Sequence, residues 1–368
     1  MEKVHETILE IDLNALTHNF QYLKSRTNTQ TKILAVVKAF AYGSDASEIA
    51  KHLETLNVDY FAVAYTNEGV ALRDAGIVTP ILVLHPQSVN FKTLIDRCLE
   101  PSLYSAFVLN EFIKVAEEKK QTNYPVHIKF NTGLNRLGFD STEIPKISSK
   151  LKNTKSIHVK SIFSHLAASE DFNEKVFTEN QIKLFKTISQ SFAKTMGYQP
   201  MLHLCNTSGI LNYPDAHFDM VRSGIGLYGF GNSDIEDEHF TPIATLKSII
   251  SQIHRIKKGD SVGYNRAFIA TKQTKTATIP IGHADGIGRQ YGNGKGFVTI
   301  NNIQAPIIGN VCMDMIMVDI TNIACQVGDE VIIFGTNPTA NVFAETAKSI
   351  SYEIITSISQ RVKRVFLK

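Results

Sequence analysis

The chain has 368 residues, of which 43% are hydrophobic, so it is long enough to bury a large core and to form two domains. Its formal net charge of +3 is small and its lysines are scattered, so it shows no electrostatic footprint for nucleic acid or a membrane surface. Residues 1–6 carry acids where a signal peptide would have basic and apolar regions, and we expect a cytoplasmic protein. The four cysteines lie far apart without a Cys-x-x-Cys pair, which argues against a zinc site or a disulfide framework.

The first two-thirds of the chain predict an α/β barrel. Residues 7–11 alternate as a strand does, and Asp12 follows as a typical helix N-cap. Short apolar runs then alternate with amphipathic helix patterns, which is the pattern of a (β/α)8 TIM-type barrel. The eight strand-like runs are 33–39, 60–64, 80–85, a weak one near Leu103, 126–130, 159–165, 201–205 and 220–228.

One helix of this region has clear boundary signals. Thr178-Glu179-Asn180-Gln181 is typical of a capping box that opens a helix, and Gly197 is a typical stop. We interpret its apolar face as core packing rather than a cofactor contact. The residues of that face are Ile182, Phe185, Ile188 and Phe192.

A change of pattern after the acidic stretch 231–238 predicts a second domain. Long helical periodicity fades there and β-rich segments take over. These segments are 275–281, 297–300, 305–308, 316–320 and 330–334. We therefore predict a barrel over residues 12–237 and a mainly β domain over residues 238–368.

Lys38 stands at the end of the apolar run that begins at residue 33. A lysine at the end of a buried parallel strand lies at the mouth of a barrel, where desolvation lowers its pKa and makes the amine nucleophilic. The alternative is a lysine whose stem packs on the strand end while its ammonium group reaches water. The segment by itself does not separate the two interpretations.

The segment Lys38-Ala39-Phe40-Ala41-Tyr42-Gly43 resembles the lysine signature of alanine racemases, which use pyridoxal phosphate (PLP). Further segments of that family follow in the same order and extend the resemblance over essentially the whole chain. The resemblance implies a fold-type III racemase that interconverts L- and D-alanine for peptidoglycan synthesis. It also implies that the N-terminal strand, residues 1–11, joins the C-terminal β domain, and that two copies form a homodimer with composite active sites.

The resemblance implies cofactor contacts at several strand ends. Lys38 would bind PLP covalently, Tyr42 and Thr207 would reach its phosphate, and His165 would pack against its ring. The full set is Lys38, Tyr42, His165, Asn206, Thr207, Arg222, Gly224 and Ile225. The alternatives are structural: a barrel-rim hydroxyl for Tyr42, a helix N-cap for Thr207 and a satisfied strand-end histidine for His165.

Arg222 opens the second strong signature, residues 222–229. A guanidinium group opposite the pyridine nitrogen of PLP stays protonated and leaves that nitrogen unprotonated, which favours racemisation over decarboxylation and transamination. Alternatively, an arginine near a strand end pairs with a surface acid. Without Lys38, that alternative would be preferred.

Further family segments imply the substrate side of the site. Within residues 127–138, Arg136 would address the substrate carboxylate, and Lys129, commonly carbamylated in the family, would orient it. Tyr264, within residues 261–266, would be the second base, on the face of the substrate opposite Lys38. Met313 and Asp314 would complete the substrate side. A nucleophilic role for the neighbouring Cys312 is disfavoured, because no paired histidine motif is present.

The chain departs from the family pattern at Phe40, His283, Asn310 and Gln360, all of which leave the catalytic groups in place. These positions bear on PLP affinity, on the width of the substrate channel and on the preference for alanine. The alternative functions are a broader amino-acid racemase, a decarboxylase on the same barrel and a non-catalytic PLP-binding barrel. Arg222 disfavours the decarboxylase, and Tyr264 with the β domain disfavours the non-catalytic protein.

Overall fold

The computed structural model of the protein describes residues 6–368 and divides into two compact units. The barrel unit comprises residues 17–41 and 46–240. The β unit comprises the N-terminal segment up to Leu16, residues 42–45 and residues 241–368. Residues 1–5 of the predicted N-terminal strand lie outside the described residues.

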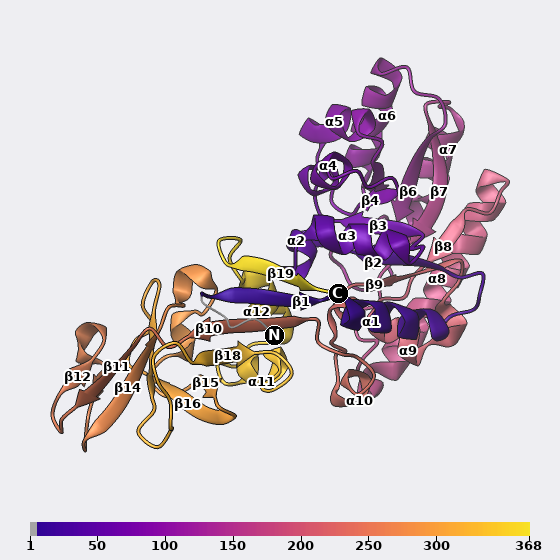
Figure 1. The fold of residues 1–368 in the computed structure, drawn as a ribbon. Helices are drawn as coiled ribbons and strands as arrows, with labels where there is room; N and C mark the ends of the chain where they lie inside the picture. Colours follow the sequence, from indigo (N-terminus) through magenta and orange to yellow (C-terminus); the bar gives the residue numbers. More distant parts are fainter. Residues whose placement is uncertain (1–5) are drawn as a thin grey trace. The chain divides into compact units, whose positions relative to one another are not determined.

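The barrel unit is built on a closed ring of parallel strands in which β9 pairs with β2. Figure 1 shows these strands with helices around them. The strands are short and almost wholly buried, as expected where helices cover a parallel sheet. They are β2 (Lys32–Val36), β3 (Tyr60–Val63), β4 (Ile81–Val83), β5 (Glu100–Leu103), β6 (Tyr124–Lys129), β7 (Ile157–Phe163), β8 (Met201–His203) and β9 (Met220–Ser223).

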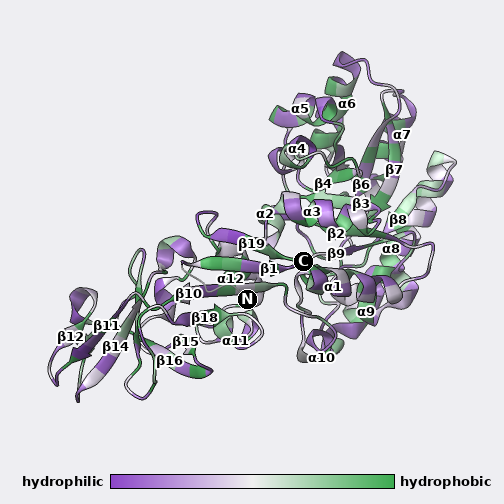
Figure 2. Ribbon diagram, viewed as in Figure 1, coloured by the Kyte–Doolittle hydropathy of each residue, from purple (hydrophilic) through white to green (hydrophobic). Residues whose placement is uncertain are grey.

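Helices alternate with these strands. In Figure 2 the barrel helices carry both hydrophilic and hydrophobic residues, as expected for helices with one face against the strands. The helices of this part of the chain are α1 (Leu13–Ser25), α2 (Lys38–Tyr42), α3 (Ala46–Thr55), α4 (Thr66–Asp74), α5 (Phe91–Asp96), α6 (Ala106–Glu118), α7 (Ile144–Lys152), α8 (Lys175–Met196), α9 (Thr207–Asn212) and α10 (Asp234–Asp237).

Helix α8 begins one turn earlier than predicted, so the capping box proposed at Thr178 is wrong. The hydroxyl of Thr178 donates to the Ala168 carbonyl at 3.2 Å, and the side-chain oxygen of Gln181 accepts from the Ala167 amide at 3.0 Å. Both side chains therefore hold the loop after β7 instead of capping the helix. The predicted apolar face is correct for Phe185, Ile188 and Phe192, which are buried, while Ile182 is half-buried.

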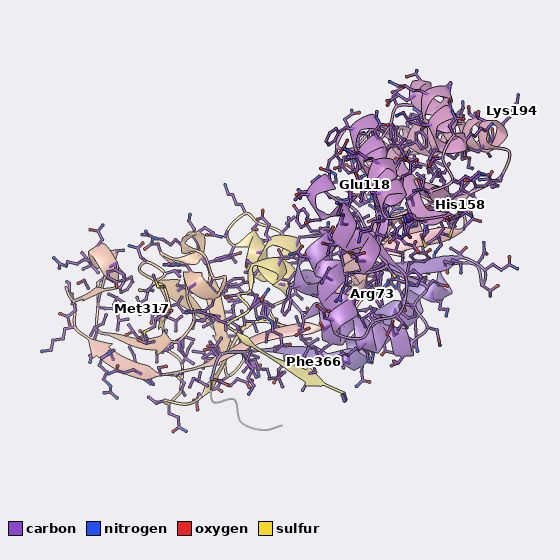
Figure 3. The ribbon with its side chains drawn as sticks, turned by 90° about the horizontal axis from the view of Figure 1, so that it is seen from above. Arg73, Glu118, His158, Lys194, Met317 and Phe366 are labelled. Atoms are coloured by element: carbon purple, nitrogen blue, oxygen red, sulfur yellow. The ribbon has the colours of Figure 1, made fainter. Side chains whose placement is uncertain are left out.

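The far end of α8 is as predicted. Gly197 ends the helix in the left-handed conformation, with φ 84°. Lys194, in the last turn, extends away from the barrel unit in Figure 3. A basic residue there also complements the negative end of the helix dipole.

The β unit contains a nine-stranded sheet in the order β11-β14-β17-β16-β15-β18-β10-β1-β19. Its strands are β1 (Ile8–Asp12), β10 (Ala244–Ile249), β11 (Gln252–Ile256), β14 (Thr274–Ile279), β15 (Phe297–Ile300), β16 (Ile303–Ile308), β17 (Ile316–Asp319), β18 (Glu330–Phe334) and β19 (Lys363–Leu367). A separate ribbon consists of β12 (Ser261–Val262) and β13 (Phe268–Ile269), and the helices are α11 (Ala340–Glu345) and α12 (Ser351–Ser357). The predicted class, a (β/α)8 barrel followed by a mainly β domain, is confirmed.

The first strand belongs to this sheet, where β1 pairs antiparallel with β10 and parallel with β19. Asp12 then caps α1 as predicted, because its carboxylate accepts from the amides of Asn14 at 2.8 Å and Ala15 at 3.0 Å. Sequence analysis missed β10, β11 and β19. The edge strand β11 is mostly exposed and polar, so it lacks the apolar alternation that marks a strand.

Several barrel strands end before the predicted apolar runs do, and the difference is largest for two of them. Strand β2 ends at Val36 rather than residue 39, and β9 ends at Ser223 rather than residue 228. Buried residues continue past both ends. After β2 they are Val37, Ala41 and Tyr42, although Ala39 between them is exposed, and after β9 they form the 3₁₀ turn η5 (Ile225–Tyr228).

Candidate active site

Reactive side chains gather at the carboxyl ends of the barrel strands. Lys38 follows β2, Lys129 ends β6, His165 follows β7, Thr207 follows β8 and Arg222 lies within β9. Because all strands of the barrel are parallel, these ends meet at one mouth, where such folds place their chemistry. The predicted barrel-side residues are therefore brought together.

Lys38 opens a left-handed turn. Residues 39–42, all non-glycine, have φ between 51° and 57°, a conformation that costs each residue about 1–2 kcal/mol. Glu68 secures the turn, because one of its carboxylate oxygens accepts from the Ala39 amide at 2.6 Å. The other oxygen accepts from the Ala64 amide at 2.7 Å and the Tyr65 amide at 3.0 Å. Glu68, which sequence analysis missed, thus joins the lysine turn to the end of β3.

The mouth is rich in positive charge. Burial lowers the pKa of Lys38, the neighbouring Arg136 lowers it further, and Glu68 opposes the change. Burial also lowers the pKa of Lys129 to about 8, with further contributions from Arg136, Arg222 and Lys38. The amines are therefore easier to deprotonate than ordinary lysines, which suits both a nucleophile and a proton acceptor.

Arg222 is buried and held on several sides. Its Nη1 donates to His203 Nδ1 at 2.8 Å, and its Nη2 donates to the carbonyls of Ser164 at 2.7 Å and Leu204 at 2.9 Å. Burial lowers its pKa to about 10, so the group stays a cation at neutral pH. The alternative prediction, a surface acid as partner, is wrong, because these partners are carbonyls and an imidazole.

His165 is a neutral neighbour of this cation. Its Nδ1 lies 3.2 Å from Arg222 Nη2 and accepts from it, because a guanidinium group can only donate. Burial and the charge of Arg222 hold the pKa of His165 well below its usual value. The ring therefore carries its hydrogen on Nε2.

Two hydroxyl groups and a 3₁₀ turn form a candidate phosphate cradle. Thr207 Oγ1 lies 3.1 Å from Ser223 Oγ, and the Gly226 amide donates to Thr207 Oγ1 at 3.4 Å. Gly224 is the N-cap residue of η5, and Ile225 is its first residue. The first amides of a helical turn lack intrahelical acceptors, so with the hydroxyls they suit an anion. Ser223 was missed, although it lies inside the arginine signature.

Asn206 has a capping role. Its side-chain oxygen accepts from the Gly209 amide at 2.9 Å and from the Ser169 hydroxyl at 2.7 Å. It is the N-cap of α9, whereas Thr207 is the first helical residue. The alternative interpretation of Thr207 as the N-cap is therefore wrong.

Tyr264 belongs to the β unit, in the turn η6 (Tyr264–Arg266) after β12, and is 73% exposed. Asn310 supports the turn, because its side-chain amide donates to the Tyr264 carbonyl at 3.0 Å. Tyr264, Met313 and Asp314 line an open groove of about 700 Å³. The structure therefore brings these three predicted residues together within the β unit.

Asp314 is engaged in an ion-pair network. Arg361 Nη2 donates to Asp314 at 2.6 Å, and Arg361 Nε donates to the buried Asp285 at 2.7 Å.

Tyr42 also belongs to the β unit, with its ring centroid 6.1 Å from that of Tyr352. Burial, and then Tyr352, raise the pKa of Tyr42, so its hydroxyl stays protonated and able to donate.

The barrel mouth fits an organic ligand with anionic groups. Lys38, Lys129, Arg136 and Arg222 interact electrostatically, and such a cluster favours a ligand that brings negative charge. Lys38 supplies an amine able to bind an aldehyde, and the Thr207–Ser223 cradle suits a phosphate.

Within residues 6–368 no group of three or more His, Cys, Asp or Glu side chains forms a metal site. Over the same range, no helix is both long and apolar enough to cross a membrane.

Comparisons with known proteins cover the whole chain. The family models described as the N-terminal and C-terminal domains of alanine racemase match residues 11–231 and 243–366. An alanine racemase of Thermodesulfovibrio yellowstonii is 35% identical in an alignment of 366 positions that covers 97% of each chain. A solved alanine racemase of Clostridium difficile has a TM-score of 0.92 at 33% identity and covers 100% of this chain and 97% of its own. That of Bartonella henselae, described with covalently bound pyridoxal phosphate, has a TM-score of 0.88 at 29% identity, covering 99% and 100%.

The strain in the left-handed turn can be tested with one type of substitution, alanine to glycine. It should change the free energy of unfolding in opposite directions at two positions. Ala39 is exposed with φ 53°, so Ala39→Gly should raise the free energy of unfolding by about 1 kcal/mol. Ala71, exposed in the right-handed helix α4, is the matched control, and Ala71→Gly should lower the free energy by about 1 kcal/mol. Urea unfolding measures both. A loss of stability in both variants would contradict the strain assigned to the turn.

Proposed function

The chain belongs to the alanine racemase family, and from this premise we propose that it interconverts L- and D-alanine with two bases, Lys38 and Tyr264. Membership makes the protein a PLP-dependent isomerase. The observation that carries the proposal is the pair formed by a desolvated lysine and a buried arginine at the barrel mouth. In the proposed cell context, the D-alanine serves peptidoglycan synthesis in the cytoplasm.

The barrel mouth provides groups for each part of the cofactor. Lys38 would hold it covalently, the hydroxyls of Thr207 and Ser223 with the amides of Gly224 and Ile225 would bind its phosphate, and His165 would pack on its ring. Tyr42 would donate to the phosphate, while Asn206 holds the start of α9. When bound, PLP withdraws the electron pair left on the substrate Cα after its proton is removed.

Two bases are proposed because racemisation requires proton removal on one face of Cα and proton delivery on the other. One fixed base would return the proton to the face from which it came. Lys38 Nζ takes or gives the proton on one face, and the Tyr264 hydroxyl does so on the opposite face. Lys38 suits this exchange because burial and Arg136 lower the pKa of its amine.

Arg222 sets the type of reaction. As a donor that remains a cation at neutral pH, it would bind the pyridine nitrogen of PLP without supplying a full proton to it. A carboxylic acid in its place would strengthen electron withdrawal and open decarboxylation and transamination. Among residues 6–368 no acid is hydrogen-bonded to Arg222, whose partners are carbonyls and imidazoles, and this supports a racemase over a decarboxylase.

The substrate side is proposed to consist of Arg136, Met313 and Asp314. Arg136 would bind the substrate carboxylate, and the Met313 amide with Asp314 would complete the pocket. The ion pair between Arg361 and Asp314 supports this role, because it fixes the orientation of that carboxylate.

Assembly as a two-fold homodimer is proposed from the exposure of the second base. Tyr264 is 73% exposed and Met313 is 58% exposed, although both would have to meet a substrate. In a closed two-fold dimer, Lys38 of one chain and Tyr264 of its partner would form two equivalent composite sites.

We also propose that the border between the two functional domains lies between residues 237 and 238.

The primary test is a chiral assay of the PLP-loaded protein with L-alanine and L-serine, with Lys38→Ala as control. L-Alanine should approach an equal mixture of enantiomers, and Lys38→Ala should lose both this activity and the adduct that borohydride fixes. Both losses are expected because Lys38 is proposed as the amine that binds PLP. Peptide mapping of the reduced protein locates the adduct, and an adduct on a different lysine would refute the assignment. Faster turnover of L-serine would identify a broader racemase.

Lys129 is proposed to carry a carbamate, which would turn a cation beside Arg136 into an anion that pairs with it. Only the neutral amine reacts with CO₂, and the pKa of Lys129 is lowered to about 8. Carbamylation should therefore increase as pH rises from 7 to 9. The ¹³C NMR spectrum in labelled bicarbonate should show a carbamate signal that Lys129→Arg abolishes. Persistence of the signal in that variant would contradict the proposal.

The composite site is tested by complementation between two inactive variants, Lys38→Ala and Tyr264→Phe. After subunit exchange, each mixed dimer holds one site with both bases and one site with neither. Random pairing makes about half of the dimers mixed, so roughly a quarter of all sites should recover activity. Mixtures that contain heterodimers by mass spectrometry and yet stay inactive would show that Tyr264 acts within its own chain or is not the second base.

A further inference from the structure

A chain of hydrogen bonds runs through the barrel interior and ends at Arg222. Glu100 Oε2 lies 2.7 Å from His127 Nε2, and His127 Nδ1 lies 2.5 Å from Ser161 Oγ. Ser161 Oγ lies 2.9 Å from His203 Nε2, and His203 Nδ1 lies 2.8 Å from Arg222 Nη1. The three middle side chains are 0% exposed. Branched aliphatic residues dominate most barrel interiors, so a polar chain here calls for a specific reason.

Arg222 sets the direction of every hydrogen bond in the chain. A guanidinium group only donates, so Nδ1 of His203 accepts and the neutral ring carries its hydrogen on Nε2. That hydrogen goes to the oxygen of Ser161, whose own hydrogen goes to His127 Nδ1. His127 then donates from Nε2 to the carboxylate of Glu100, which only accepts. Donors and acceptors therefore match in one direction over the whole length.

The opposite end is held by charge. Lys160 Nζ donates to Glu100 Oε1 at 2.8 Å, and the Tyr60 hydroxyl donates to Glu100 Oε2 at 3.2 Å. Burial acts to raise the pKa of Glu100, but hydrogen bonds from His127 and Lys160 outweigh it and keep the carboxylate ionised. Burial, followed by the charge of Arg222, holds the pKa of His203 well below its usual value. The chain thus links the carboxylate of Glu100 to the guanidinium group of Arg222.

If each hydrogen bond in the chain had its donor and acceptor exchanged, the hydrogen bond between His203 and Arg222 could not form. If His127 donated to Ser161, the hydroxyl of Ser161 would donate to His203 Nε2. His203 would then carry its hydrogen on Nδ1 and point it at the Nη1 donor of Arg222. Two donors would face each other in the interior, where an unmade hydrogen bond to a charged group is costly.

We propose that Glu100, His127 and Ser161 are positioning residues that act on Arg222 through His203, by keeping His203 in the tautomer that accepts from the guanidinium group. This inference rests on the proposed function of Arg222 beside the pyridine nitrogen. The chain orients the guanidinium group from within the barrel, so its position is set by the protein before a cofactor binds.

Glu100→Gln should reverse the chain without a change in side-chain size. Because Lys160 only donates, the amide oxygen faces Lys160 and the amide NH₂ faces His127. His203 is then left with a hydrogen on Nδ1 against Arg222. In the PLP-loaded protein, ¹⁵N spectra of labelled histidine should show this change of tautomer. The kcat for alanine should fall about tenfold while KM stays within about twofold.

The double variant Glu100→Gln/Lys160→Met separates direction from stability. Without Lys160 the amide oxygen is free to face His127, so the His203 tautomer and kcat should return to wild-type values. Lys160→Met alone keeps the carboxylate and should behave as the wild type. If Glu100 and Lys160 had a merely structural role, the losses of kcat caused by the two substitutions would add in the double variant instead of cancelling. A double variant as impaired as Glu100→Gln, or an unchanged His203 tautomer in Glu100→Gln, would overturn the proposal.

A second comparison removes one buried hydroxyl at a time. Ser161→Ala breaks the chain and should lower kcat about tenfold. Ser102→Ala is the matched control, because Ser102 is 0% exposed on β5, pairs in register with His127, and has a hydroxyl group without a hydrogen-bond partner among residues 6–368. Equal effects in the two variants would contradict the proposal. If the wild type does not racemise alanine, the proposed function fails, whereas the tautomer of His203 still decides this inference.

Discussion

A positive charge inside the barrel, on Arg222, constrains much of what surrounds it. The side chain is 5% exposed, and a buried guanidinium group without acceptors would cost several kcal/mol. Because it can only donate, every neighbour has to accept. The loops after β7 and β8 meet this requirement by turning the carbonyls of Ser164 and Leu204 inward. His165 and His203 meet it as neutral rings whose Nδ1 atoms accept.

The same charge shapes the chemistry of the mouth. It contributes to the lowered pKa values of Lys129 and His165, after the larger effect of burial. Arg136 acts likewise on Lys38. A cluster of this kind is unfavourable in the empty protein and becomes favourable with a phosphate and a carboxylate, so its electrostatic cost is linked to ligand affinity.

The β unit supplies a different kind of order. The Tyr264 turn is secured through the backbone by Asn310, and Asp314 is secured by Arg361, which in turn binds the buried Asp285. These contacts all lie within the β unit and hold residues that line the exposed groove. Asn310, where the sequence departs from the pattern that the resemblance implies, reaches the carbonyl of Tyr264 through its short side-chain amide. The departure therefore leaves the turn supported.

The fold class and most of the strands could be predicted from the sequence, because hydrophobic periodicity and capping are local properties. Asp12 and Gly197 mark helix ends by interactions within a few residues, and both predictions are correct. Lys38, Arg222 and Tyr264 could be recognised as candidates, because their neighbours in the chain form segments that resemble a family. The capping box at Thr178 failed because its side chain bonds to a loop ten residues away in sequence.

The sequence alone shows which chemical groups are present and in what order, whereas the tertiary structure decides which of these groups contact one another. Glu68 meets Ala39 across 29 residues, and Glu100 meets His127 across 27. His203 reaches Arg222 because β8 pairs with β9 in the barrel. Burial and neighbouring charge then select which groups carry protons. These depend on which strands are adjacent and in which register, and no local pattern of amino acids encodes that information.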